Sequence, residues 1–317
     1  MEVVINALSG RSRVIIGDTF QNLANLLPHE DVFVITDGNV YPLLGQLKSK
    51  YPTHTITPGE SSKSLGVAQN IYEWLLEKGA HRRSFILGFG GGVVCDIAGF
   101  VASTYMRGIH FGFVATSLLA QVDASVGGKN GLNLDGYKNI IGTFKQPEFV
   151  ICDVLMLKTL PNEELANGFA EIVKHTLIAD AKMFGFIEEN VEGLLNRNGQ
   201  IIEKLVEHSV RVKARIVQAD EFEKGERKKL NLGHTWGHAV EKLSGLPHGQ
   251  SVSIGLEFAA RLSLEKGLLD AHDYQRLINL LQELRLPTVT TLNPLQLFDA
   301  LTRDKKKIAD SVDFILM

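Results

Sequence analysis

Three histidines stand close together in the sequence at a spacing that suits metal binding. His234 and His238 are four residues apart in the segment NLGHTWGH, so a helix would place both on one face. His248 follows in LPHG, and Glu171 lies on an earlier segment with a helical pattern. Imidazoles and one carboxylate can form a zinc site with an open position. The spacing leaves open which histidines are ligands, and packing in the core is the alternative for any single one.

A run of glycines, GFGGG, extends from Gly88 to Gly92 between a strand-like and a helix-like segment. Glycines in such a turn let backbone N–H groups approach a phosphate, which the helix dipole also favours. The standard dinucleotide fingerprint requires a glycine where Val93 stands, so a tight packing turn is an equal alternative. Asp37, after an earlier strand-like segment, could bind a ribose hydroxyl, although a turn residue is the commoner role.

Small residues surround an aspartate and a lysine in LAQVDASVGGK, which extends from Leu119 to Lys129 and indicates a functional loop. Further basic residues follow at Lys138, Lys213, Arg227 and in the run DKKK at 304–307. A single basic residue is usually solvated surface. Together, in a chain with a net charge of −3, they favour a substrate with several negative charges, such as a phosphorylated acid.

The composition narrows the class of protein. Of 317 residues, 44% are hydrophobic and 22% are charged, as in a globular protein, and the length suits two domains. The net charge of −3 argues against a nucleic-acid binder, and two cysteines exclude a disulfide scaffold. The N-terminus has no secretory pattern, and no apolar run approaches the ~20 residues that span a membrane. We therefore expect a cytoplasmic protein that binds neither nucleic acid nor membrane.

The pattern of elements changes near residues 153–159. Before this point, strand-like and helix-like segments alternate, which predicts a parallel sheet covered by helices, with a hairpin at its start. The predicted strands are 3–7, 13–16, 31–36, 53–57, 84–87 and 109–115, and the predicted helices are 64–78 and 93–106. Later segments have helical patterns, at 163–178, 181–189, 199–220, 235–243, 252–266, 271–284 and 295–303, before a strand-like end at 314–317. We predict an α/β domain at 1–155 and a helical domain at 156–317.

Seven segments resemble the 3-dehydroquinate synthase family of sugar-phosphate cyclases, and they occur in the family's order through almost the whole chain. They are GGGVVCDIAG (90–99), YMRG (105–108), LLAQVDASVGGK (118–129), KNIIG (138–142), GFAEIVK (168–174), NLGHTWGH (231–238) and HG (248–249). Glycerol dehydrogenases and iron alcohol dehydrogenases share the family's fold but lack this set. The resemblance implies a Rossmann-like N-terminal domain, a helical metal-binding C-terminal domain, NAD, and one divalent metal, zinc or cobalt.

Position by position, the resemblance implies that the metal ligands are Glu171, His234 and His248. It implies substrate contacts at Asp123, Lys129, Asn139, Lys174, Lys213, Arg227, Asn231, His238 and Lys305, the last within the segment 304–306. It implies NAD contacts at Asp37, Asn39, Glu60, Lys63, Gly91, Gly92, Asp96, Thr116, Ser117, Lys138, Thr159, Leu160 and Glu164. Arg107 matches an arginine that reaches the phosphate in a neighbouring subunit, which implies a homodimer.

The implied activity converts 3-deoxy-D-arabino-heptulosonate 7-phosphate to 3-dehydroquinate and phosphate, in the shikimate pathway of aromatic amino acid biosynthesis. It proceeds by transient oxidation with NAD, phosphate elimination, reduction and intramolecular aldol closure. One alternative is a cyclase for a substrate without the carboxylate, making 2-deoxy-scyllo-inosose or an epi-valiolone. The others are an NAD-dependent polyol dehydrogenase and a non-catalytic NAD-binding protein. The complete set of basic positions and metal ligands favours the first activity.

Overall fold

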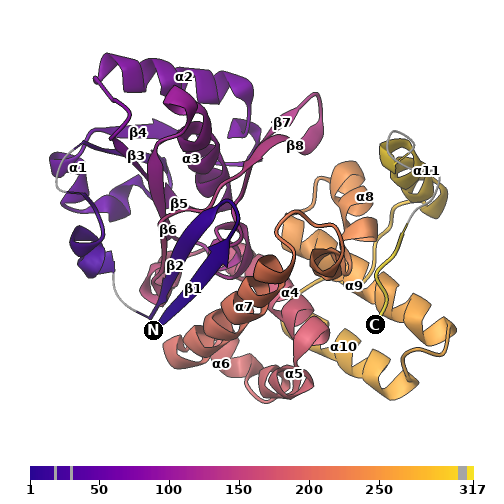
Figure 1. The fold of residues 1–317 in the computed structure, drawn as a ribbon. Coiled ribbons are helices and arrows are strands. Elements are labelled where there is room, and N and C mark those ends of the chain that lie inside the picture. The colour runs from indigo at the N-terminus through magenta and orange to yellow at the C-terminus, as the bar shows by residue number, and fades with distance from the viewer. Residues whose placement is uncertain (18–19, 29–30, 306–312) are drawn as a thin grey trace. The chain divides into compact units, whose positions relative to one another are not determined.

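The structure is a computed structural model that describes residues 1–17, 20–28, 31–305 and 313–317, with the side chains of Gln21 and 302–305 left out. It divides into two compact units. Unit 1 comprises residues 1–160 and 206–222, and unit 2 comprises 161–205 and 223–317. The sequence pattern placed 206–222 in the second domain, whereas this segment packs with unit 1. The helices and strands of both units are labelled in Figure 1.

Unit 1 contains a seven-stranded sheet with the order β1-β2-β9-β6-β5-β3-β4. The strands are β1 (Glu2–Ala7), β2 (Gly10–Ile16), β3 (Val32–Asp37), β4 (Thr53–Ile56), β5 (Phe85–Gly90), β6 (His110–Ala115) and β9 (Phe149–Cys152). Strands β1 and β2 form the expected antiparallel hairpin, and every other pair in this sheet is parallel. The predicted α/β class with a parallel sheet is therefore confirmed, although the sequence pattern missed β9.

The helices of unit 1 include one with a side-chain N-cap, α2, and one that is largely buried, α3. They are α1 (Leu47–Lys50), α2 (Leu65–Glu77) and α3 (Gly92–Thr104), together with part of α7 (Gly199–Ala219). The hydroxyl of Ser64 accepts a hydrogen bond from the backbone N–H of Val67 at 3.3 Å, so Ser64 is the N-cap of α2 as predicted. Helix α3 packs on β5 and β6, and most of its residues are buried. The turn between β5 and α3 is thereby held against the sheet.

The order of the strands creates a switch point between β3 and β5. From β3 the chain first continues outward to β4, and then returns to the other side of β3 to form β5 and β6. Ligands of open parallel sheets bind at the carboxyl ends of the strands beside such a point. Asp37 ends β3 and Gly90 ends β5, so the glycine run lies at this edge.

A second, two-stranded sheet follows β6 in unit 1 and was not anticipated. Strands β7 (Lys129–Leu134) and β8 (Tyr137–Phe144) are antiparallel. Their turn contains Asp135 and Gly136, with φ of 50° and 79°. Positive φ at both central residues is typical of a tight hairpin turn, for which Asp-Gly is a preferred sequence. The dipeptide was the signal that the strand pattern overlooked.

Unit 2 is helical, as expected. Its helices are α4 (Asn162–Ala179), α5 (Ala181–Glu188), α6 (Val191–Leu195), the start of α7, α8 (His234–Ser244), α9 (His248–Glu265), α10 (Ala271–Glu283) and α11 (Pro294–Lys305). Residues 313–317 form no strand, which corrects the prediction for 314–317. Within the described parts of the chain, no helix has the length and apolarity needed to cross a bilayer.

Helices α8 and α9 pack very closely. A Cβ on Gly255 of α9 would lie only 1.8 Å from the carbonyl oxygen of Gly233, the residue before α8. A Cβ on Gly237 would lie 2.8 Å from the carbonyl oxygen of Ser251. The glycines therefore allow the two backbones to approach in an antiparallel arrangement, with the start of α8 beside the middle of α9. Each of these helices begins with a histidine.

Candidate functional site

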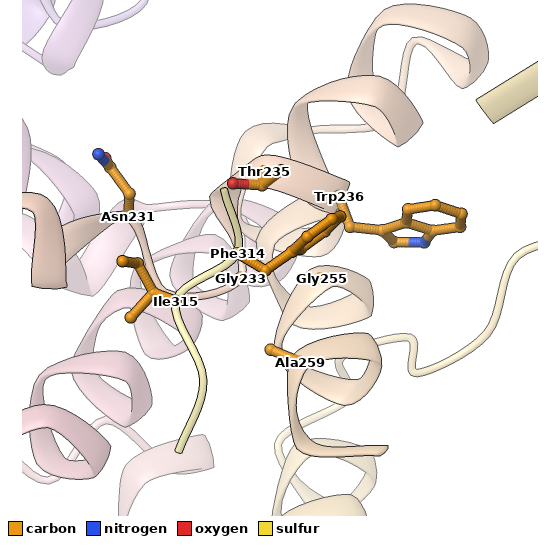
Figure 2. A pocket seen from close by; sticks show the side chains of 8 residues that line it. All are labelled: Asn231, Gly233, Thr235, Trp236, Gly255, Ala259, Phe314 and Ile315. Carbon is orange, nitrogen blue, oxygen red and sulfur yellow. The ribbon is translucent and has the colours of Figure 1, made fainter. Parts of the chain in front are cut away.

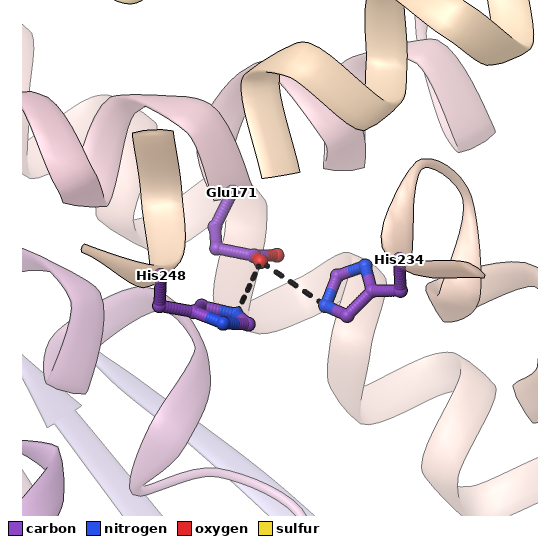
Figure 3. Close-up of side chains that lie close together, drawn as sticks. All are labelled: Glu171, His234 and His248. Carbon is purple, nitrogen blue, oxygen red and sulfur yellow. Dashed lines mark ion pairs between the residues drawn. The ribbon is translucent and has the colours of Figure 1, made fainter. Parts of the chain in front are cut away.

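Glu171, His234 and His248 converge within unit 2 (Figure 3). Glu171 lies on α4, and its side chain is fully buried. Its Oε1 lies 3.5 Å from Nε2 of His234 and 3.4 Å from Nε2 of His248. One donor atom from each residue lies within 4.8 Å of the other two. A carboxylate and two imidazoles at these separations match the donor set that a divalent ion such as zinc prefers.

Each of the two histidine rings also has a polar group at its other nitrogen, Nδ1. Nδ1 of His234 lies 3.2 Å from the carbonyl oxygen of Leu232. Nδ1 of His248 lies 3.3 Å from Oε2 of Glu241, a buried residue of α8. Both rings therefore direct Nε2 toward Glu171 and Nδ1 away from it.

The two histidines experience opposite electrostatic environments. Burial, followed by the nearby Lys174 ammonium, lowers the pKa of His234 well below its ordinary value. Burial also lowers the pKa of His248, but the carboxylates of Glu171 and Glu241 outweigh it and raise that pKa to about 9. Carboxylates on two sides of one imidazole form a strongly cation-attracting environment.

Lys174 and His238 lie beside this cluster, and Arg227 belongs to the same unit. The ring of His238 is exposed, with its centroid 5.2 Å from that of His234 and 6.1 Å from that of His248. Lys174 is buried and forms an ion pair with Glu171. Arg227 is also buried, on the short 3-10 segment Glu226–Asn231. Unit 2 therefore contains both the candidate metal ligands and two buried cationic side chains, Lys174 and Arg227.

Asn231 lines a small pocket beside the start of α8 (Figure 2). Its amide nitrogen donates to Oε1 of Glu223 at 2.5 Å. The C-terminal segment also lines the pocket, with Ile315 on the side of Asn231 and Phe314 extending toward Trp236. The carbonyl oxygen of Asp313 accepts a hydrogen bond from the hydroxyl of Thr235 at 3.1 Å. The C-terminal segment thus covers the helix that carries His234.

Within unit 1, the turn that leads into α3 and the first residue of that helix are glycines. Gly91 is the N-cap of α3 and makes no side-chain capping bond. A Cβ on Gly91 would lie 3.3 Å from Oγ of Ser117, and one on Gly92 would lie 3.0 Å from Cβ of Ala124. The N–H of Thr116 donates to the carbonyl oxygen of Gly90 at 3.0 Å, which joins the ends of β5 and β6. This turn fits the diphosphate of a dinucleotide, because helix N-termini with exposed N–H groups favour anions.

A lysine links several predicted NAD positions at this edge. Nζ of Lys63 lies 2.6 Å from Oδ2 of Asp96 and 3.8 Å from Oε1 of Glu60, and it also donates to Oδ1 of Asn139. Lys63 is buried. Burial raises the pKa of Asp96 despite the opposing effect of Lys63. Residues from three separate segments, 60–63, α3 and β8, are thereby held together.

Asp123 and Lys213 form a second pair within unit 1. Nζ of Lys213 lies 2.6 Å from the carbonyl oxygen of Asp123 and 2.7 Å from its Oδ1. Asp123 lies in a π-helical turn, Ala120–Ala124, and Lys213 lies in the part of α7 that belongs to unit 1. Lys129, the first residue of β7, is exposed. The structure thus explains why residue 213 packs with the N-terminal unit.

The remaining predicted residues lie outside these contacts. Oδ1 of Asp37 accepts from the N–H of Asn39 at 2.8 Å, which agrees with the turn role. Arg107 and Lys138 are exposed, Thr159 and Leu160 end a 3-10 segment, and Glu164 lies in the first turn of α4 in unit 2. Lys305 ends α11, but its side chain and residue 306 lie outside what the structure describes.

Two residues of this site were missed by the sequence analysis. Glu241 contacts His248, and Glu223 accepts the hydrogen bond from Asn231. Glu241 is seven residues after His234, so on a helix it shares a face with that histidine. That spacing was the available signal for Glu241; Glu223 lies in a loop, where periodicity gives no signal.

Family models match most of the chain. The description "3-dehydroquinate synthase N-terminal" matches residues 53–167, and "3-dehydroquinate synthase C-terminal" matches residues 168–307. The chain belongs to the 3-dehydroquinate synthase family. A 3-dehydroquinate synthase of Caldanaerobacter subterraneus subsp. tengcongensis is 40% identical over 100% of this chain and 94% of its own length. One from Thermoanaerobacter sp. (strain X514) is 40% identical over 94% of this chain and 88% of its own length.

Solved structures of two other cyclases are also similar to this chain. A 2-deoxy-scyllo-inosose synthase complexed with carbaglucose-6-phosphate, NAD+ and Co2+ has a TM-score of 0.88 at 25% identity, over 100% of this chain and 92% of that one. ValA, a 2-epi-5-epi-valiolone synthase from Streptomyces hygroscopicus subsp. jinggangensis with NAD+ and Zn2+ bound, has a TM-score of 0.85 at 27% identity, over 93% and 86%. The predicted fold family is therefore confirmed.

Proposed function

We propose that this chain is a lyase that converts 3-deoxy-D-arabino-heptulosonate 7-phosphate to 3-dehydroquinate and phosphate, in the shikimate pathway of aromatic amino acid biosynthesis. Curated relatives with this name are 40% identical over nearly the whole chain. The observation that carries the proposal is the convergence of Glu171, His234 and His248. These are the residues to which the family resemblance assigns the metal.

NAD and a divalent metal would be held by separate parts of the chain. When bound, NAD would accept a hydride from the substrate and return it, and a divalent metal would polarise a substrate hydroxyl. Glu171, His234 and His248 would hold the metal. Gly91, Gly92 and the first N–H groups of α3 would contact the diphosphate of NAD, with Lys63 positioned by Asp96 beside them.

The basic residues would hold the anionic substrate. Charge-assisted hydrogen bonds from lysine and arginine suit a phosphate and a carboxylate. We assign this role to Lys129, Lys174, Lys213 and Arg227, with Lys213 oriented by Asp123. Fixing the substrate in one conformation makes phosphate elimination and aldol closure intramolecular steps between oriented groups. We assign Asn139, Asn231 and His238 to the substrate's hydroxyl groups, and Lys305 to its anionic groups.

We propose that the protein is a homodimer in the cytoplasm. Arg107 is exposed, as an arginine that reaches a second copy must be. Met106, Arg107 and Gly108 all have positive φ, 49°, 68° and 111°, so the backbone there is strained into one tight turn. Light scattering should give the mass of two chains. A monomer with full activity would contradict the proposed role of Arg107.

Phosphate release from the heptulosonate phosphate tests the function directly. Catalytic NAD predicts steady phosphate release without accumulation of NADH, and a strong chelator should stop it. Net NADH production from a polyol would instead indicate a dehydrogenase. Turnover of a phosphorylated sugar without the carboxylate, in preference to the acid, would indicate a different cyclase.

Lys129→Ala separates substrate binding from NAD binding. Turnover should fall strongly while NAD affinity is retained, because Lys129 is assigned to the substrate alone. Lys78→Ala is the matched control, since its side chain is 45% exposed and pairs only locally with Glu77 in the contacts described. Unchanged turnover in Lys129→Ala would contradict the assignment.

A further inference from the structure

A carboxylate behind His248 is not explained by metal binding alone. Glu241 is 7% exposed and lies in the last turns of α8. Burial of a carboxylate is unfavourable unless other groups stabilise its charge. Its Oε2 lies 3.3 Å from Nδ1 of His248, on the opposite side of the ring from Glu171. The imidazole of His248 therefore lies between two carboxylates, one at each ring nitrogen.

We propose that Glu241 is a positioning residue that fixes the orientation and tautomer of His248 for metal binding. This inference rests on the metal site proposed above. With a hydrogen on Nδ1 donated to Glu241, the lone pair of His248 lies on Nε2, the atom that faces Glu171. A carboxylate in this position also makes the imidazole a stronger ligand. Glu241 acts through His248 and contacts no substrate in this proposal.

The connection between α8 and α9 holds this arrangement. Gly245 ends α8 with a φ of 70°, and its N–H donates to the carbonyl oxygen of Glu241 at 3.0 Å. A left-handed residue at the end of a helix favours glycine. Three residues after Gly245, α9 begins at His248, with Pro247 as its N-cap. The Glu241–His248 contact therefore spans a tight helix–helix turn.

His234 has the same arrangement with a different acceptor. Its Nδ1 faces the carbonyl oxygen of Leu232 at 3.2 Å, and its Nε2 faces Glu171 at 3.5 Å. Backbone carbonyls and carboxylates are the two usual partners of a metal-binding histidine. Both histidines thus present Nε2 inward. The backbone acceptor cannot be removed by a side-chain substitution, whereas Glu241 can be changed.

A competing explanation is that Glu241 is itself a ligand. One donor atom each from His238, Glu241 and His248 also lies within 4.8 Å of the other two. That set shares His248 with the first one. The two explanations make different predictions, because loss of a ligand should weaken the metal site more than loss of an orienting group.

Metal affinity of the purified full chain is the test. Zn2+ affinity is measured by competition with a chromophoric chelator for wild type, Glu241→Ala, Glu241→Gln and His248→Ala. We expect a ~10- to 100-fold weaker affinity in Glu241→Ala, the usual effect of removing a group behind a metal ligand. We expect a smaller loss in Glu241→Gln, whose amide oxygen can still accept from Nδ1, and loss of specific binding in His248→Ala.

A control separates positioning from stability. Glu257→Gln also removes a carboxylate from unit 2, one that accepts from the hydroxyl of Tyr274 at 2.9 Å and lies outside the cluster. It should keep wild-type Zn2+ affinity whatever its effect on thermal unfolding. In the Zn2+-loaded wild type, ¹⁵N NMR should show His248 protonated at Nδ1 only.

Each outcome decides the proposal. Wild-type affinity in Glu241→Ala, or protonation of His248 at Nε2 with the metal on Nδ1, would overturn it. A loss in Glu241→Ala as large as that in His248→Ala would also overturn it, since Glu241 would then be a ligand. If the wild type bound no Zn2+, the proposed metal site would fail, which is a separate result from failure of the positioning role.

Discussion

The two units form their candidate sites in different ways. At the sheet edge of unit 1, backbone N–H groups are left open by glycines, and the charged side chains nearby are already paired, Lys63 with Asp96 and Lys213 with Asp123. In unit 2, Glu171, His234 and His248 direct their acceptor atoms toward a common region. The first arrangement offers backbone donors, which suit an anion. The second places a buried carboxylate, which also pairs with Lys174, beside two imidazoles, a set of groups that suits a divalent cation.

This difference predicts which site tolerates change. A site made of backbone N–H groups needs free space at the glycine turn between β5 and α3. Side chains added there should weaken NAD binding gradually. A site of three side chains loses a third of its donors with one substitution. We therefore expect substitutions of the proposed metal ligands in unit 2 to have larger effects on ligand affinity than substitutions at the sheet edge of unit 1.

The largest effect should follow removal of a proposed ligand. Glu171→Gln replaces a carboxylate that faces both histidines, and Zn2+ affinity should fall by more than ~100-fold, beyond the range for groups behind a ligand. Turnover should be lost while NAD affinity, measured by fluorescence titration, is kept. His272→Ala is the control, because that histidine is 79% exposed on α10. Full Zn2+ binding by Glu171→Gln would remove the distinction between the two sites.

The next largest effect should follow disruption of the close packing between α8 and α9. In Gly255→Ala the new Cβ would meet the carbonyl oxygen of Gly233 at 1.8 Å, so α8 and α9 must separate. We expect destabilisation of about 3 kcal/mol, measured by urea unfolding, together with weaker Zn2+ binding because His234 follows Gly233. Gly185→Ala, where a Cβ would meet nothing within 4 Å, should change stability little. Equal behaviour of the two variants would argue against a site held by backbone packing.

A smaller effect is expected at the glycine turn of unit 1. Gly92→Val would crowd Ala124, whose Cβ lies 3.0 Å from the added Cβ, and its methyl groups would cover the start of α3. We expect about a tenfold loss of NAD affinity, roughly 1.4 kcal/mol, with unchanged Zn2+ binding. Gly66→Val, the same change in the first turn of α2, has its nearest neighbour at 4.0 Å and should leave NAD affinity unchanged. A loss of Zn2+ binding in Gly92→Val would show that the two sites are not separable.

The smallest effect concerns the segment that brings Lys213 to unit 1. Burial raises the pKa of Glu221, but hydrogen bonds from Ser9 and Gln146 outweigh it and hold that pKa below its ordinary value. The ionised form therefore stabilises the fold, and this contribution is present above the unfolded pKa of 4.5 and is lost as the pH falls through the lower folded value. Glu221→Gln should cost about 1 kcal/mol at pH 7.

Urea unfolding at a series of pH values measures this contribution. The difference between wild type and Glu221→Gln should shrink below pH 4.5, because only the wild type loses a charge there. A difference that stays constant across this range would show that hydrogen bonding, and not the charge of Glu221, anchors the segment.

Most elements of the fold could be predicted from local pattern. Alternating apolar residues and caps such as Ser64 specify strands and helices through interactions within a few residues. Helix α9 shows where this reasoning fails. The apolar period suggested a start at residue 252, whereas the helix begins at His248. The pattern missed this start because the first turn after Pro247, His248-Gly-Gln-Ser251, is polar. The hairpin of β7 and β8 was missed for a similar reason, since polar residues and glycines interrupt its apolar pattern and its signal lies in the Asp135-Gly136 turn.

The amino-acid sequence determined the chemistry available to this protein: imidazoles and a carboxylate for a metal, glycines for a diphosphate, and basic groups for an anionic substrate. It could not choose among His234, His238 and His248, because helical spacing fixes which side chains share a face and says nothing of what that face meets. Tertiary structure brings two of them to Glu171 by turning α8 into α9 over three residues and packing α9 against both α8 and α4. That packing brings Nε2 of His248 to within 3.4 Å of Oε1 of Glu171.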